Sequence, residues 1–459
     1  MARRPRAAAH CRRRPRHCAR PGRCAAGAAG ARPGVRRVSD ASAIARAPGA
    51  PERAVLALVA LPEDAVDPAD AMDELASLVE AAGAEVAGSL LQNRKLPDRA
   101  TWLGAGRVDD LRALADERRA TVVVCGADLT PAQGVNLEKR LGRRVVDRSQ
   151  LIMDLFAVRA RTHQARLQVE LAQLQYSLPR LKRMWTHLDR MKGGIGMRGP
   201  GETQLELDRR EIEVKISDRR RRIAVIEQAH ALRREGRAGR FTVGLIGYTN
   251  AGKSSLFNEL TRQRVEAENR VFTTLDTKTS PWRVAPGCNV LLSDTVGFVR
   301  NLPHHLIASF HATLQEALEA DLLLHVVDGA RPDSHLLIAA VEAVLVEVGA
   351  GDRPRRLVVN KIDAVADRAL CARFGSDALL VSARTGEGLD ELAAFVAARA
   401  RVADVTLTLR IPHADGAALA AVRARADVLR AESDDQATLV EARLPPDLAG
   451  RLRCYSVSQ

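Results

Sequence analysis

A glycine-rich loop between an apolar run and a helical pattern constrains this chain of 459 residues more than any other feature. The apolar run covers residues 241–246, and the helical pattern begins at Ser254. Glycines in such a loop let backbone N–H groups turn toward phosphate oxygens at a helix N-terminus, and its lysine adds positive charge. A glycine-rich turn that binds nothing is the alternative, but it leaves the flanking strand and helix unexplained. The predicted phosphate loop consists of Gly247, Tyr248, Thr249, Asn250, Ala251, Gly252, Lys253 and Ser254.

A second motif follows another apolar run, residues 290–293. Asp294 could hold Mg²⁺ through a water molecule, and the N–H of Gly297 could reach the terminal phosphate. This arrangement predicts a sensor of the third phosphate of a nucleoside triphosphate. The motif consists of Asp294, Thr295, Val296 and Gly297.

Two later motifs predict recognition of guanine. A carboxylate at Asp363 could accept hydrogen bonds from the ring N–H and the exocyclic amine of guanine, and adenine has no such pair of donors. The aliphatic stem of Lys361 could lie over the base. Taken alone, Asp363 would more often be a helix N-cap. The two motifs, each after an apolar run, are Asn360, Lys361, Ile362 and Asp363, then Ser382, Ala383 and Arg384.

The segment between the first two motifs is predicted to supply a further magnesium ligand and to order when Mg²⁺ and the γ-phosphate are present. Position relative to the other motifs favours Thr274 over Thr273 as this ligand. The predicted magnesium ligands are therefore Ser254, Thr274 and Asp294, and the predicted catalytic residues are Lys253, Thr274 and Gly297. The whole segment contains Phe272, Thr273, Thr274, Leu275 and Asp276.

Phe298 stands where Ras-like enzymes place the glutamine that orients the attacking water. Because an apolar side chain cannot orient water, we predict slow intrinsic hydrolysis that a partner accelerates. The alternative is that Phe298 packs in the core while another residue of this chain positions the water.

Composition divides the chain unevenly. Residues 1–40 carry twelve arginines and a single acid, Asp40, so most of the formal charge of +14 lies there. We expect residues 1–52 to be disordered, as an organellar transit peptide or as an extension without a role in the fold. Scattered cysteines indicate a reducing compartment, and no apolar run approaches the roughly 18 residues of a membrane span. The predicted location is cytoplasmic, or mitochondrial or plastid if residues 1–50 are a transit peptide.

Residues 53–149 alternate short apolar runs with helical stretches, which predicts a small α/β domain with a mostly parallel sheet. Within it, Gly104 and Gly106 precede a helix expected to start near Asp109. This pair of glycines could contact a phosphate, but such a pair more often forms a tight turn.

Residues 150–239 predict an antiparallel coiled-coil hairpin. The first arm has leucines and a tryptophan at alternating steps of four and three from Leu167 to Leu188, with an expected kink at Pro179. The second arm starts near Gln204, and the glycine-rich tip covers residues 193–201. The hairpin is also the basic part of the folded chain, which favours contact with RNA over a merely solvated face. These are Arg180, Lys182, Arg183, Arg190, Lys192, Arg198, Arg209, Arg210 and residues 219–222.

The expected fold class is therefore α/β: a P-loop GTPase domain at 240–401, preceded by the α/β domain and the hairpin. Residues 402–459 predict a small α+β appendage with strands at 405–411 and 438–444, an Ala/Arg-rich helix between them and a short final helix.

The stretch GGIGMRGPGETQLE at 193–206, upstream of the phosphate loop, closely resembles the HflX family of GTPases. Shorter matches are RARTH at 159–163, WTHL at 185–188 and DTVGFVR at 294–300. The resemblance implies a magnesium-dependent GTPase that binds the large ribosomal subunit and its rRNA and splits stalled ribosomes. It also implies that some members hydrolyse ATP through the N-terminal domain, which would give the loop at Gly104 a role.

Two hypotheses remain. The first is an enzyme that couples GTP hydrolysis to ribosome binding and release. The second is an RNA-binding or assembly scaffold that nucleotide switches, with incidental turnover. In both cases we expect a monomer that binds RNA and not DNA.

Overall fold

The computed structural model describes residues 51–64, 66–181, 200–235, 241–263, 277–295, 297–300, 320–365 and 368–457. Several predictions lie outside the described residues: the N-terminal extension, the segment 272–276 with Thr274, Val296, the far end of the first hairpin arm, and residues 193–199 of the tip.

The N-terminal domain contains a four-stranded parallel sheet in the order β2-β1-β3-β4, as the sequence predicts. Central strand β1 faces both layers: Leu56 lies in one apolar cluster, whereas Val55 lies in another. A strand buried on both faces reads as a continuous apolar run, which residues 54–59 are. The strands are β1 (Arg53–Ala60), β2 (Glu85–Asn93), β3 (Val122–Cys125) and β4 (Arg144–Val146).

Helices cover both faces of this sheet. α1 (Pro68–Ala81) and α4 (Arg148–Arg159) pack in one cluster, and α2 (Ala105–Glu117) and α3 (Pro131–Leu141) pack in the other. The sequence analysis missed α4, which lies at the start of the range predicted to form the hairpin. Its side chains are buried nearly all round, so it shows no amphipathic period.

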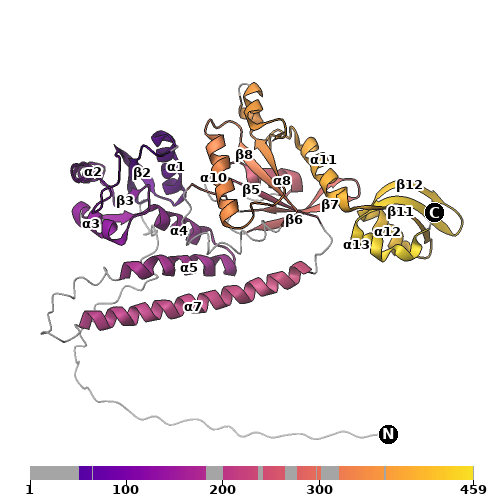
Figure 1. The fold of residues 1–459 in the computed structure, drawn as a ribbon, viewed down its shortest axis with the longest axis horizontal. Coiled ribbons are helices and arrows are strands. Elements are labelled where there is room, and N and C mark those ends of the chain that lie inside the picture. The colour runs from indigo at the N-terminus through magenta and orange to yellow at the C-terminus, as the bar shows by residue number, and fades with distance from the viewer. Residues whose placement is uncertain are drawn as a thin grey trace, which may run out of the picture. The chain divides into compact units, whose positions relative to one another are not determined.

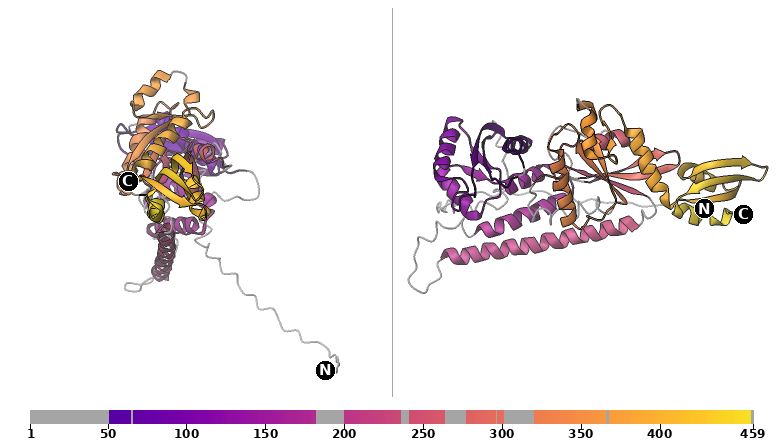
Figure 2. Two further views of the ribbon diagram at one scale, coloured as in Figure 1. Left: turned by 90° about the vertical axis from the view of Figure 1, so that its right-hand side faces the viewer. Right: turned by 45° about the horizontal axis from the view of Figure 1, so that its top comes forward.

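Two helices from the predicted hairpin pack together (Figure 2). They are α5 (His163–Ser177), followed by a 3-10 turn η2 (Leu178–Arg180), and α7 (Pro200–Glu235). The 3-10 turn lies at Pro179, where the sequence predicts a kink. Shared apolar contacts come from Leu167, Leu171 and Leu181 on one side and Ile212, Ile216 and Ile223 on the other.

One detail of the predicted tip is wrong. The loop was expected to extend through residue 201, but α7 begins at Pro200. Proline is favourable in the first helical turn because its missing N–H needs no partner there. The glycine-rich segment outside the helix therefore ends at residue 199.

The third domain contains a six-stranded sheet in the order β10-β9-β8-β5-β7-β6 (Figure 1). All neighbours are parallel except β6 and β7. Pro281 lies in β6, which is an edge strand, as proline requires. The strands are β5 (Thr242–Gly247), β6 (Lys278–Ala285), β7 (Cys288–Asp294), β8 (Leu322–Asp328), β9 (Arg355–Asn360) and β10 (Leu379–Leu380).

Helices lie on both faces of this sheet as well. α8 (Lys253–Thr261) and α11 (Leu389–Ala400) share an apolar cluster on one face, and α10 (Ser334–Glu347) packs on the other. Short 3-10 helices η3 (Ile362–Ala364) and η4 (Arg368–Phe374) follow β9. The α/β class predicted from the sequence is confirmed.

The C-terminal domain is a three-stranded antiparallel sheet, order β11-β13-β12, with two helices packed on it. Its elements are β11 (Val405–Pro412), α12 (Gly416–Arg425), β12 (Asp427–Ser433), β13 (Ala437–Leu444) and α13 (Pro446–Arg451), with 3-10 turns η5 (Arg401–Ala403) and η6 (Arg453–Tyr455). The sequence analysis missed β12, because this edge strand is largely exposed and lacks a clear alternation of apolar and polar residues.

No helix in the described residues combines the length and the apolar character that a membrane span needs.

Candidate nucleotide-binding site

The predicted motifs meet at one edge of the six-stranded sheet. Parallel strands β5, β7 and β9 end at Gly247, Asp294 and Asn360, so their carboxyl ends lie along the same edge. Strands β7 and β6 lie on one side of β5, whereas β8, β9 and β10 lie on the other, so the strand order reverses at β5. Ligands of open α/β sheets bind at such a point.

The phosphate loop is shaped by two glycines. Gly252 has φ of +90°, and a Cβ atom there would lie 2.2 Å from Nδ2 of Asn360. Gly247 has φ of +145°, and its Cβ would lie 2.1 Å from the carbonyl oxygen of Val326. Both positions therefore require glycine. The next residue, Lys253, is the first of α8, so the loop delivers its N–H groups at a helix N-terminus.

Lys253 is buried inside this loop. Its Nζ donates hydrogen bonds to the carbonyl oxygens of Gly247 (2.9 Å) and Tyr248 (2.8 Å). Burial lowers the pKa of Lys253 to about 8, against its ordinary 10.5, and nearby Asp294 opposes this shift. A phosphate group bound in the loop would supply the negative charge that compensates the buried ammonium of Lys253.

Ser254 and Asp294 lie together, as a metal site at this edge requires. The Ser254 hydroxyl donates to Oδ2 of Asp294 at 2.7 Å, and the Asp294 side chain is fully buried. Hydroxyl and carboxylate oxygens are the ligands that Mg²⁺ prefers in proteins. These two residues therefore fit the predicted ion, whereas Thr274 lies outside the described residues. In the same motif, Thr295 instead donates its hydroxyl to the carbonyl of Leu245 at 2.7 Å and helps hold the strand ends together.

The predicted guanine motifs also come together. Oδ1 of Asp363 accepts from the Ser382 hydroxyl at 2.6 Å, and Oδ2 pairs with Nη2 of Arg384 at 2.9 Å. The Ser382 hydroxyl, and next the Arg384 guanidinium, hold the pKa of Asp363 below its ordinary value. Asp363 is therefore anionic at neutral pH, the form that accepts hydrogen bonds. Ile362 differs from its neighbours: it is buried and packs in a small apolar cluster.

The Asn360 side chain connects two loops of the protein by hydrogen bonds. Its Nδ2 donates to the carbonyl oxygen of Ala251 at 2.9 Å, and its Oδ1 accepts from the N–H of Ala383 at 3.0 Å. The side chain is 1% exposed. It thereby fixes the phosphate loop relative to the loop that carries Ser382.

The sequence analysis missed Asp328, at the end of β8. Its Oδ2 lies 2.7 Å from Nζ of Lys361, whose backbone is left-handed with φ of +63°. This ion pair fixes the amine of Lys361, whose aliphatic stem is predicted to lie over the base. An acid at the carboxyl end of an apolar run was the available signal.

Gly297 and Phe298 lie against the phosphate loop. A Cβ at Gly297 would lie 2.8 Å from Cγ2 of Thr249, so only glycine allows this approach. The N–H of Phe298 donates to the carbonyl of Gly247 at 3.1 Å, and its carbonyl accepts from the N–H of Thr249 at 2.8 Å. The Phe298 side chain is buried at 2% exposure, so it packs in a core and does not face the nucleotide site.

The loop at Gly104 presents its N–H to protein. That N–H donates to Oε1 of Gln92 at 3.0 Å, and Arg94 packs over the glycine. The helix begins at Ala105, four residues before the expected start. Nucleotide binding at this loop stays a prediction.

Three family models match successive parts of the chain. A model described as GTP-binding GTPase N-terminal matches residues 69–157, and one described as GTP-binding GTPase Middle Region matches residues 159–237. A third, described as 50S ribosome-binding GTPase, matches residues 242–361. The first of these ends within α4, which places that helix with the N-terminal domain.

Curated relatives match over most of the chain. GTPase HflX of Magnetococcus marinus is 42% identical over 410 residues, which are 88% of this chain and 95% of the relative. GTPase HflX of Escherichia coli is 44% identical over 356 residues, 75% of this chain and 82% of the relative. A GDP-bound GTP-binding protein from Sulfolobus solfataricus is a weaker structural match, with a TM-score of 0.40 and 24% identity over 74% of this chain and 97% of that one. With its nucleotide motifs gathered at one sheet edge and relatives of this similarity, the chain belongs to the HflX family of GTPases.

Proposed function

We propose that this GTPase binds the large ribosomal subunit and couples magnesium-dependent GTP hydrolysis to the splitting of stalled ribosomes. The model matched by residues 242–361 describes a 50S ribosome-binding GTPase, which supports the ribosome as partner. Mg²⁺ would bind at Ser254 and Asp294, with Thr274 completing its protein ligands, and would neutralise charge on the phosphates during hydrolysis. The chain would act as a monomer in the cytoplasm.

Exposed arginines on the long helix α7 are the observation that carries this proposal. Its 36 residues correspond to about 54 Å of helix. Arg210, Arg220 and Arg221 are exposed and make no hydrogen bond or ion pair within the described part of the chain. Arg209 and Arg222, in contrast, pair with acids on the same helix. Unpaired arginines on a long helix suit a phosphate backbone, which supports contact with rRNA.

Slow hydrolysis by the isolated protein is part of the proposal. Phe298 is buried and apolar, so it cannot orient the attacking water. The ribosome would order the switch segments or supply a polar group. A scaffold with incidental turnover is the competing function, and it needs affinity for the ribosome without acceleration of hydrolysis.

Steady-state GTP hydrolysis with and without 50S subunits tests the proposal. We expect stimulation of about tenfold or more, the scale of one well-placed catalytic contact, and no activity in Lys253→Ala. Nucleotide-dependent binding without stimulation would favour the scaffold, and neither binding nor stimulation would refute the ribosomal function.

Two variants then locate the contact. The double change Arg210→Glu and Arg221→Glu should weaken 50S binding and leave the basal rate of GTP hydrolysis unchanged. The control is Arg112→Glu with Lys139→Glu, which makes the same charge change at exposed positions of α2 and α3. If both double variants lose the same affinity for 50S subunits, the loss comes from net charge and not from a contact at α7. Deletion of residues 193–199 should leave intrinsic hydrolysis intact and abolish splitting.

A further inference from the structure

Two consecutive residues at the start of α4 contact different parts of the molecule. Asp147, the N-cap of α4, accepts a hydrogen bond from Nη2 of Arg180 at 2.9 Å. Arg148, the first helical residue, donates from Nη2 to Glu74 on α1 and to the carbonyl oxygen of Arg300 at 3.1 Å. Arg180 lies in η2, just beyond the end of α5 in the first hairpin arm, whereas Arg300 follows the phosphate-sensing motif.

The contact on the hairpin side joins a half-buried arginine to a buried carboxylate. The Arg180 guanidinium lies 3.4 Å from the centre of the Tyr176 ring and also donates to the carbonyl of Leu129 at 2.9 Å. Asp147 is 4% exposed and also accepts from the N–H of Gln150 at 2.9 Å. Because α4 fixes this carboxylate, any shift of Arg180 acts on the N-terminus of α4.

The contact on the nucleotide side involves backbone as well as side chains. The N–H of Arg300 donates to the hydroxyl of Tyr248, in the phosphate loop, at 2.9 Å. Burial, and next the charge of Glu74, raise the pKa of this hydroxyl. Nη2 of Arg300 lies 2.5 Å from Oδ2 of Asp333, and its Nε lies 3.8 Å from Oε2 of Glu74. Glu74 therefore interacts with both Arg148 and Arg300, and its charge acts on the Tyr248 hydroxyl of the phosphate loop.

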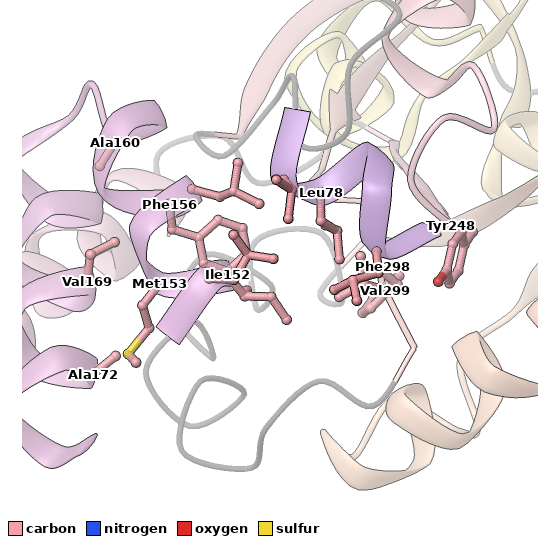
Figure 3. Packing of buried hydrophobic residues seen from close by; sticks show 14 of the residues in the cluster. Leu78, Ile152, Met153, Phe156, Ala160, Val169, Ala172, Tyr248, Phe298 and Val299 are labelled. Atoms are coloured by element: carbon pink, nitrogen blue, oxygen red, sulfur yellow. The ribbon is translucent and has the colours of Figure 1, made fainter. Parts of the chain in front are cut away.

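Little water reaches these charges. The side chains of Glu74, Arg148, Arg300 and Asp333 are 7–11% exposed. Leu78, Ile152, Phe298 and Val299 belong to one apolar cluster that both domains share, and Figure 3 shows Phe298 and Val299 packed beside Leu78. Buried charges interact strongly, and removing one partner leaves the other uncompensated.

We propose that Arg148 is a positioning residue for GTP hydrolysis and that the pair Asp147–Arg148 connects η2 of the first hairpin arm to the segment 297–300. Arg148 holds the carbonyl of Arg300, three residues after Gly297, whose N–H is expected to meet the γ-phosphate. Because Phe298 stands where other GTPases have a water-positioning glutamine, the rate of hydrolysis depends more strongly on the position of the 297–300 backbone. The inference rests on the GTPase activity and not on the ribosomal proposal.

Intrinsic hydrolysis by the full chain, without ribosomes, tests this. We compare Arg148→Met, which removes the charge at similar size, with Arg148→Lys, which retains it. Arg143→Met is the matched control, because it breaks an ion pair with Asp116 that lies within the N-terminal domain and involves no residue of the nucleotide motifs. For Arg148→Met we expect kcat to fall about tenfold with KM for GTP changed less than about threefold, partial recovery in Arg148→Lys, and wild-type values in the control.

The connection to the hairpin needs a double-mutant cycle. Arg180→Met should also lower kcat, and its effect should disappear in the Arg148→Met background, because the effect of Arg180 is expected to reach the nucleotide site through Arg148. If the two losses multiply instead, the connection is refuted. A kcat for Arg148→Met at or above the wild-type value, with only a lower Tm, would show that Arg148 is structural. Should Arg148→Met not fold, Glu74→Gln, which keeps the shape and loses the charge, serves in its place with the same expected outcomes.

Discussion

Replacing Asn360 by alanine should weaken nucleotide binding without any loss of a base contact. The side chain makes two buried hydrogen bonds, to the carbonyl of Ala251 and from the N–H of Ala383. Leaving two buried groups without partners costs about 2 to 4 kcal/mol in total. In the empty protein the two loops relax toward water, so nucleotide binding must restore their arrangement. We therefore expect affinity for GDP to fall about 30-fold to 1,000-fold.

Displacement of a fluorescent GDP analogue measures this change, and Tm of the empty protein measures folding separately. Asn289→Ala is the control, because Asn289 is exposed on the same domain. Asn360→Asp should be worse than alanine, since a carboxylate oxygen would face the carbonyl of Ala251. A GDP affinity of Asn360→Ala within about threefold of wild type would refute the role of Asn360 as a connection between the loops.

Two further predictions follow from the site. Asp363→Asn should relax the preference for guanine, because the amide places an N–H donor opposite one of the two guanine donors. Competition between GTP and xanthosine triphosphate would detect the change. An unchanged preference for GTP would contradict the assignment of Asp363. The pKa of Lys253, about 8 in the empty protein, sets a pH dependence: GTP phosphates bind the charged form, so affinity should be constant below pH 8 and fall up to about tenfold per pH unit above it. Titration of affinity from pH 6.5 to 9.5 checks this, and Lys253→Met should bind weakly with no such slope.

The nucleotide motifs could be predicted from the sequence because each is local. Each follows a short apolar run, and parallel strands bring their carboxyl ends to one edge, so the linear order already implied the grouping of Gly247, Asp294 and Asn360. The roles inside the site were harder. Asn360 belongs to a motif predicted to recognise guanine, and only its two hydrogen bonds across the chain place it between loops.

The contacts between domains had no sequence signal. Glu74, Arg148 and Arg300 are separated by 74 and 152 residues along the chain, and each looks like an ordinary surface charge when read locally. Helix α4 was missed for a related reason, since burial on all sides removes the periodicity that marks an amphipathic helix. The sequence analysis did not predict β6 either, although a signal was present: Ser280, Trp282 and Val284 alternate toward the core, and Pro281 is typical of an edge strand.

The uninterrupted length of α7 has a mechanical consequence. Only six residues separate its last residue, Glu235, from Thr242, where the strand that leads into the phosphate loop begins. A stiff rod amplifies rotation: turning about 54 Å of helix by roughly 5° moves its far end by about 5 Å, close to the spacing between neighbouring nucleotides. A displacement too small to disturb the packing of the GTPase domain could thus become, at the start of this helix, a movement about as large as the spacing between nucleotides.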